Sequence, residues 1–277
     1  MGIGDRPPAN KFLSSGRTWS EEAQDVCRQG SHGTPAALRN MLLRGLGLPP
    51  SDMRAENLVL FGCYMPFSAP FLLRSYVRLL DRLEVDYTYL SKESCCGTPL
   101  LISAEEDNRE EAKNLSRELL NQNLAAAEEI GARTVAYFCK GCWYVSQKYL
   151  TGPKINETYY ADIFMDKLSG KSLRVKPTVV GYFEGCHTHY RQITRGVELD
   201  WGKYRKLLDR IEGLKVVDLP NKICCHANPQ GILAEAAGRN LDTIVSTCIS
   251  CAGNLGKAAG GKVKVLGLPD LLLDALG

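Results

Sequence analysis

Eleven cysteines stand in this chain of 277 residues, and ten of them fall into two sets that share one order. Each set has a single cysteine, then an adjacent pair, then a Cys-x-x-Cys motif. The first set is Cys63, Cys95, Cys96, Cys139 and Cys142, and the second is Cys186, Cys224, Cys225, Cys248 and Cys251. Only Cys27 is left over. One order with unequal gaps indicates a duplication followed by changes in loop length.

Cysteine thiolates are soft ligands that select zinc, copper(I) or iron–sulfur clusters. A structural zinc site takes four ligands, so five cysteines per half exceed its need. Neighbouring residues of an extended chain point in opposite directions, so each adjacent pair suits a cluster of several metal atoms. The sequence favours an iron–sulfur cluster in each half. Zinc in one half is the alternative, while a thioredoxin-like role of Cys139-Lys-Gly-Cys142 would leave the other cysteines unexplained.

Three of the four histidines, namely His187, His189 and His226, accompany the second set. His187 and His226 each directly follow a cysteine. Either could donate a hydrogen bond to a cluster sulfur, ligate a metal, or act as the proton donor to a sulfur substrate. Packed or surface histidines beside a polar site are the alternative. We expect His32 at the surface.

Short apolar runs lead into four of the cysteines, at 57–63, 134–139, 178–186 and 243–248. β-Branched and aromatic residues fill these runs, so they predict buried strands with a cysteine at the carboxyl end. Helical patterns cover 76–83, 108–130, 204–212 and 231–241. Alternating strands and helices predict a mainly parallel sheet with helices on both faces. Ligands of such sheets bind outside the carboxyl ends of the strands, which is where these cysteines fall.

We therefore expect an α/β protein with two pseudo-repeated Rossmann-like halves. The predicted boundaries are an N-terminal extension over 1–56, a first cysteine-rich half over 57–150, a connection over 151–176 and a second half over 177–277. The extension contains one predicted helix at 35–46, and we interpret it as a partner-docking arm or a tail.

Composition excludes several other classes of function. The net charge is +3 with scattered basic residues, so nothing predicts binding to nucleic acid or to an anionic membrane. No apolar stretch approaches the ~20 residues that span a bilayer, and the polar start lacks the apolar run of a secretory signal. We expect a cytoplasmic protein, where stable disulfides are rare. Flavin, nicotinamide and phosphate-loop fingerprints are absent from the sequence, so electrons must come from a partner protein.

The cysteine pattern resembles the tandem Cys-Cys-Gly domain in the B subunit of heterodisulfide reductase. Similar domains occur in components of glycerol-3-phosphate dehydrogenases and thiol:fumarate reductases. The resemblance covers residues 57–277. The residues that carry it are Cys63, Ser94-Cys-Cys-Gly-Thr-Pro99, Cys139-Lys-Gly-Cys142, Gly185-Cys-His187, Cys224-Cys225, Cys248-Ile-Ser-Cys251 and the closing segment 263–274.

This resemblance implies two noncubane 4Fe–4S clusters, each held by the five cysteines of one half, with a disulfide split between them. It also implies two partner proteins, a ferredoxin-like iron–sulfur protein of the C-subunit type and a flavin-bearing protein of the A-subunit type. One departure is His226, which stands where the family has glycine after the pair. Glycine permits a positive φ or a close backbone approach, and histidine resists both. A second departure is the shorter gap before Cys248.

The expected function is that of an iron–sulfur subunit in a multi-subunit oxidoreductase that exchanges electrons with a disulfide or thiol. The alternative is an electron-relay subunit without its own substrate, linking a flavoprotein to another catalytic subunit such as an acyl-CoA or quinone reductase. A zinc-stabilised scaffold is a third possibility, which metal analysis would separate from the other two.

Overall fold

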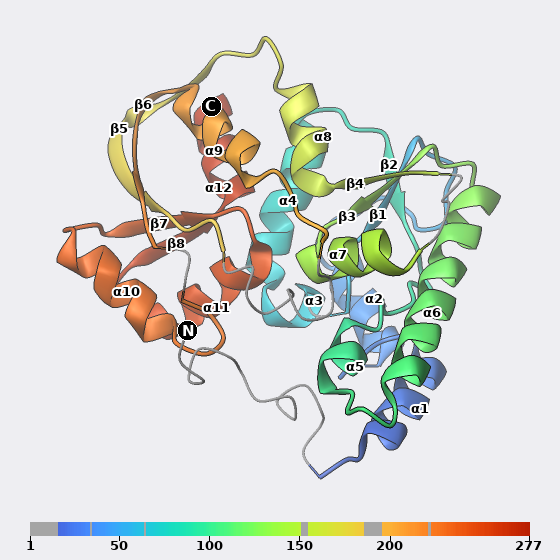
Figure 1. Cartoon of the computed structure of the whole chain (residues 1–277). Coiled ribbons are helices and arrows are strands. Elements are labelled where there is room, and N and C mark those ends of the chain that lie inside the picture. The colour runs from blue at the N-terminus through green and yellow to red at the C-terminus, as the bar shows by residue number, and fades with distance from the viewer. Residues whose placement is uncertain (1–15, 34, 64, 151–154, 186–195, 221–222) are drawn as a thin grey trace.

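A computed structural model describes residues 16–33, 35–63, 65–150, 155–185, 196–220 and 223–277 (Figure 1). Its strands form two four-stranded sheets, with the orders β2-β1-β3-β4 and β6-β5-β7-β8. All the described strand pairs are parallel. Within each sheet the second strand lies at one edge, followed by the first, third and fourth. The predicted α/β class with two similar halves is confirmed.

The strands lead into the cysteines as the apolar runs predicted. Those of the first sheet are β1 (Asn57–Leu60), β2 (Tyr87–Tyr89), β3 (Thr134–Tyr137) and β4 (Asn156–Tyr159). Those of the second are β5 (Leu173–Tyr182), β6 (Ile211–Asp218), β7 (Thr243–Ser246) and β8 (Lys264–Gly267). β1, β3 and β7 are buried over their last three residues. Cys63, Cys139 and Cys248 follow these three strands at their carboxyl ends.

Helices cover the outer face of each sheet. On the first sheet these are α1 (Trp19–Gln29), α5 (Thr98–Ser103), α6 (Arg109–Glu129) and α7 (Lys140–Tyr149). On the second they are α10 (Pro229–Gly238) and α11 (Ile249–Ala259). The predicted helix at 108–130 corresponds to α6. Within the described ranges, no helix is long and apolar enough to cross a membrane.

Between the two sheets lies a shared layer of helices (Figure 1). It contains α4 (Pro70–Arg82) and α8 (Tyr160–Lys167) from the first half and α9 (Trp201–Asp209) and α12 (Leu268–Leu276) from the second. The core is strongly aromatic. The ring of Tyr76 lies 4.6 Å from that of Tyr160 and 4.9 Å from that of Phe138, measured between centroids. One continuous hydrophobic core therefore joins the halves.

Three tyrosine hydroxyls meet at Thr247, the residue before Cys248. Tyr159, at the end of β4, donates to the Thr247 carbonyl at 3.1 Å, and Tyr160 donates to the same oxygen. Tyr182, at the end of β5, lies 3.1 Å from the Thr247 hydroxyl. Because Tyr159 and Tyr160 come from the first half, the backbone beside Cys248 is held by both halves.

The described part of the predicted extension packs against the first half. Besides α1 it contains α2 (Ala36–Arg44), and the short α3 (Met65–Ser68) follows β1. The indole N–H of Trp19 donates to the Leu100 carbonyl at 3.0 Å. Only α2 was predicted from the sequence. The reciprocal capping box of Thr18 and Glu21 is the sequence signal that marks α1.

Residues 155–167, inside the predicted connection, contain β4 and α8. β4 pairs with β3 and completes the first sheet. Its four residues, Asn-Glu-Thr-Tyr, are mostly polar, so the segment has no apolar run that would mark a strand. The predicted domain boundaries stay a prediction.

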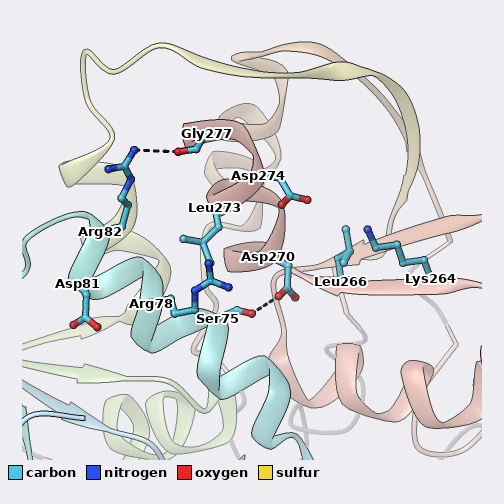
Figure 2. A pocket seen from close by; sticks show the side chains of 10 residues that line it. All are labelled: Ser75, Arg78, Asp81, Arg82, Lys264, Leu266, Asp270, Leu273, Asp274 and Gly277. Atoms are coloured by element: carbon cyan, nitrogen blue, oxygen red, sulfur yellow. Dashed lines mark hydrogen bonds between the residues drawn. The ribbon is translucent and has the colours of Figure 1, made fainter. Parts of the chain in front are cut away.

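The start of α12 contacts α4 across the two halves (Figure 2). Ser75 of α4 donates a hydrogen bond to Asp270, and Asp270 accepts the backbone N–H of Gly267 at 2.7 Å. Nearby, Arg82 donates to the carbonyl of Gly277 at 3.1 Å. Burial raises the pKa of Asp270, and the two hydrogen bonds it accepts oppose that effect. One carboxylate therefore caps a helix and links it to the other half.

Replacing Asp270 by alanine removes both the cap of α12 and the contact with Ser75. We expect Asp270→Ala to lower the free energy of unfolding by about 1–2 kcal/mol, the range for a lost cap and a partly buried hydrogen bond. Asp274→Ala, at an exposed position of the same helix, should change it by less than about 0.5 kcal/mol. Denaturant unfolding measures both values. Equal effects of the two variants would contradict this role of Asp270.

Candidate functional site

A cavity of about 650 Å³ lies beside the carboxyl ends of the strands and is lined by cysteines of both sets. The first set contributes Cys63, Cys96, Cys139 and Cys142, and the second contributes Cys225. The described lining also holds His32, His226 and Lys257, but no aspartate or glutamate. The cavity is therefore rich in sulfur and bordered by basic rather than acidic side chains.

All five cysteines of the first set lie together. The Cys95 and Cys63 sulfurs are 3.7 Å apart. Cys96 contacts both Cys95 and Cys142, and Cys142 contacts Cys139. Four of the five are buried, and Cys139 is half-buried. The structure thus brings together the whole set that the sequence pattern grouped.

Four members of the second set also lie together. The Cys225 and Cys251 sulfurs are 3.3 Å apart. Cys225 also contacts Cys224, and Cys251 contacts Cys248. All four are buried. The remaining predicted residues, Cys186, His187 and His189, lie outside the described residues, so their roles stay predictions.

Each Cys-x-x-Cys motif opens a helix. Cys139 is the N-cap of α7, and Cys248 is the N-cap of α11. The positive end of a helix dipole favours thiolate over thiol. A hydrogen bond from Cys251, the charge of Lys140 and backbone N–H groups lower the pKa of Cys248 to about 5, against the effect of burial.

In the first set, too, the pKa of one thiol is lowered. Hydrogen bonds from Cys142 and Cys95 lower the pKa of Cys96, while the pKa values of those two neighbours are raised. In each half, therefore, hydrogen bonding from a neighbouring thiol favours the thiolate form of one cysteine. Thiolates are the form that binds metal.

The glycine before each single cysteine has a positive φ and lies against the Cys-x-x-Cys motif of its own half. Gly62 has φ +77°, and a Cβ there would lie 3.2 Å from Cys139 Cβ and 3.5 Å from Cys142 Sγ. Gly185 has φ +111°, and a Cβ there would lie 3.4 Å from Cys248 Cβ and 3.5 Å from Cys251 Sγ. The duplication therefore extends to backbone conformation.

The loops after the two cysteine pairs differ. Gly97 has φ +76°, and an added Cβ would lie 2.9 Å from the Cβ of Ser116. In the second half His226 occupies the same position of the motif, and its φ is not positive. There the chain forms a turn in which Asn228 N–H donates to the Cys224 carbonyl at 2.8 Å. The strain expected for this histidine is therefore absent, because the turn itself has changed.

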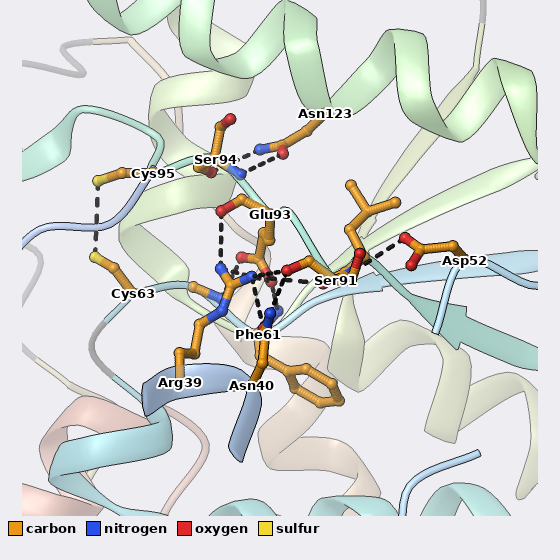
Figure 3. Close-up of polar contacts among 12 residues, drawn as sticks. Arg39, Asn40, Asp52, Phe61, Cys63, Ser91, Glu93, Ser94, Cys95 and Asn123 are labelled. Atoms are coloured by element: carbon orange, nitrogen blue, oxygen red, sulfur yellow. Dashed lines mark hydrogen bonds and ion pairs between the residues drawn. The ribbon is translucent and has the colours of Figure 1, made fainter. Parts of the chain in front are cut away.

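A buried ion pair supports the first set (Figure 3). Glu93, which is 3% exposed, accepts the backbone N–H groups of Phe61 at 3.1 Å and Gly62 at 2.6 Å. Arg39 of α2 lies 3.9 Å from the carboxylate and donates to the Glu93 carbonyl at 2.8 Å. The end of β1 and the loop that leads to Cys95 are therefore fixed to each other and to α2.

Two residues at the site were missed by sequence reasoning. His32 lines the cavity rather than the outer surface, and its Nε2 lies 3.2 Å from Glu22 Oε1. Lys140 is 3% exposed, although lysine is seldom fully buried. Its position inside a Cys-x-x-Cys motif was the available signal for a role near the cysteines.

The left-handed conformation and close packing of Gly97 make it a sensitive test of the first cysteine loop. We expect Gly97→Ala to lower the free energy of unfolding by about 1–3 kcal/mol, because the new methyl group meets Ser116 and the positive φ is strained. Gly238→Ala is the matched control. It lies at the end of α10 with no atom within 4 Å of an added Cβ, and should raise stability by up to about 1 kcal/mol. Denaturant unfolding of both variants checks the difference, and a stable Gly97→Ala protein would contradict it.

The chain is similar to one protein family and to several known proteins. The family model of the cysteine-rich CCG domain matches residues 58–145. The B subunit of fumarate reductase (CoM/CoB) from Methanothermobacter marburgensis is 24% identical over 232 residues, covering 76% of this chain and 44% of that protein. The D subunit of dihydromethanophenazine:CoB–CoM heterodisulfide reductase from Methanosarcina mazei is 24% identical over 237 residues, covering 74% of this chain and 56% of that protein.

This chain thus spans about half the length of these relatives. Among solved structures, an aspartate racemase homologue from Pyrococcus horikoshii aligns with a TM-score of 0.36 at 14% identity, covering 79% of this chain and 96% of that one. A TM-score of this size carries no argument about fold or function. Residues 58–145 thus match the model of the cysteine-rich CCG domain, and over about three quarters of its length the chain is similar to subunits of heterodisulfide and fumarate reductases.

Proposed function

We propose that this chain is an iron–sulfur subunit of a multi-subunit oxidoreductase that exchanges electrons with a disulfide or thiol. The observation that carries the proposal is the cavity, which thiols from both cysteine sets line. Relatives named as subunits of heterodisulfide reductase and of fumarate reductase (CoM/CoB) support the reaction class.

The donor set suits two noncubane 4Fe–4S clusters. The first would be held by Cys63, Cys95, Cys96, Cys139 and Cys142, and the second by Cys186, Cys224, Cys225, Cys248 and Cys251. Sulfur is the donor that such clusters require. In the described part of the chain, no three Cys, His, Asp or Glu side chains are grouped as around a single metal ion. Zinc in one half is the lesser alternative.

When bound, such clusters supply single electrons and iron atoms that accept sulfur ligands. The residues of this chain would hold the substrate beside them. A cavity of about 650 Å³ falls within the ~300–1,000 Å³ typical of small-molecule sites. The side of the cavity formed by α11 offers polar contacts. Three residues line it there at helical spacing, namely Ser250, Asn254 and Lys257.

Reduction of a disulfide takes two electrons and two protons and releases two thiols. The electrons would come from a ferredoxin-like iron–sulfur partner of the C-subunit type and a flavin-bearing partner of the A-subunit type. His226 lines the cavity, where an imidazole can pass protons near neutral pH, and we assign it as a candidate proton donor. His187 keeps the same candidate role, although it lies outside the described residues.

Metal analysis tests the cofactor assignment. Protein purified anaerobically, or reconstituted with iron and sulfide, should carry about eight iron atoms and eight sulfides per chain, four of each per cluster. Cys139→Ser should lose about half of both, because one ligand of the first cluster is gone. Cys27→Ser is the matched control, since Cys27 is exposed and lies outside both sets, and it should keep all of its iron. Stoichiometric zinc with little iron would contradict the assignment.

A second measurement separates catalysis from electron relay. Paramagnetic spectra of the loaded protein should change when a small-molecule disulfide enters the cavity. An unchanged spectrum with every disulfide tried would favour a relay subunit without its own substrate.

A further inference from the structure

Lys140 belongs to the first half but lies against the second. It stands inside Cys139-Lys-Gly-Cys142 and opens α7. Its Nζ would be 3.6 Å from a Cβ placed on Gly185, and it lies 5.4 Å from the centroid of the Trp201 ring. Gly185 and Trp201 both belong to the second half, so the ammonium group crosses between the halves.

The same ammonium group lies close to the thiols of the second set. A Cβ on Gly185 would also lie 3.5 Å from the Cys251 sulfur. One point of the second-half backbone is thus close to both groups. The buried ammonium group of Lys140 therefore lies near a sulfur of the second set.

Beside the first set, Glu93 and Arg39 form a buried pair of opposite charges, 3.9 Å apart. In the second half, Ile249 occupies the position that corresponds to Lys140 in its own Cys-x-x-Cys motif. The second Cys-x-x-Cys motif therefore has no counterpart of the Lys140 charge.

We propose that Lys140 is a tuning residue through which the first half raises the reduction potential of the cluster held by the second half. This rests on the proposed function, since it requires clusters at both cysteine sets. Reduction adds one electron to a cluster, and a buried cation at close range stabilises the added negative charge. Electrons that enter the protein would then favour the second cluster over the first.

The test is a redox titration of the full reconstituted chain, followed by paramagnetic resonance. Lys140→Met removes the charge at nearly constant length, and Lys140→Arg keeps it. We expect Lys140→Met to lower one of the two midpoint potentials and to leave the other unchanged. Lys140→Arg should keep both potentials close to those of the unchanged protein. Lys148→Met is the matched control. It makes the same change at an exposed position of the same helix and should shift neither potential.

Assignment of the shifted potential uses a Cys63→Ser chain, in which the second set is intact. Adding Lys140→Met there should still lower the remaining potential. Equal shifts of both potentials, or no shift, would overturn the proposal. So would a loss of iron in Lys140→Met and Lys140→Gln but not in Lys140→Arg, because Lys140 would then be needed for folding or loading. An unchanged chain that binds no cluster would instead refute the proposed function, and iron and sulfide analysis before titration identifies that case.

Discussion

The carboxylate of Glu93 accepts the backbone N–H groups of Phe61 and Gly62, and these bonds join the end of β1 to the loop that carries Cys95 and Cys96. Burial raises the pKa of Glu93, while Arg39 and the two N–H groups favour its charged form. Removal of either charge from such a buried pair costs about 3–5 kcal/mol, because the other is left uncompensated. The position of Cys63 therefore depends on α2, a helix outside the cysteine-rich pattern.

The two sheets share one strand order and so place equivalent cysteines at equivalent positions. Gly62 and Gly185 also repeat a positive φ beside the Cys-x-x-Cys motif. The halves differ in the groups around those ligands. His226 lies in a turn unlike that of Gly97, and Lys140 of the first half has no basic counterpart in the second Cys-x-x-Cys motif. Duplication preserved the donor set, while the charges and hydrogen-bond donors beside it diverged.

The sequence allowed prediction of the strands that are continuous apolar runs, such as β1 and β3, and of the long helix α6. It did not reveal β2 or β4, because a strand of three or four residues with polar members has no clear period. The cysteine grouping was predictable from order alone. The contacts of Arg39 with Glu93 and of Lys140 with Trp201 were not, because each joins residues far apart in the chain that only the fold brings together.

The aromatic layer between the sheets is made by both halves, so neither half covers its own apolar face. The inner faces of α4 and α8 are covered by α9 and α12, and the core they form is continuous. A half produced alone would expose that apolar face to water. Such surfaces are unstable in a monomer and favour pairing with a second copy. A half with this face would therefore need a second copy or another protein to cover it.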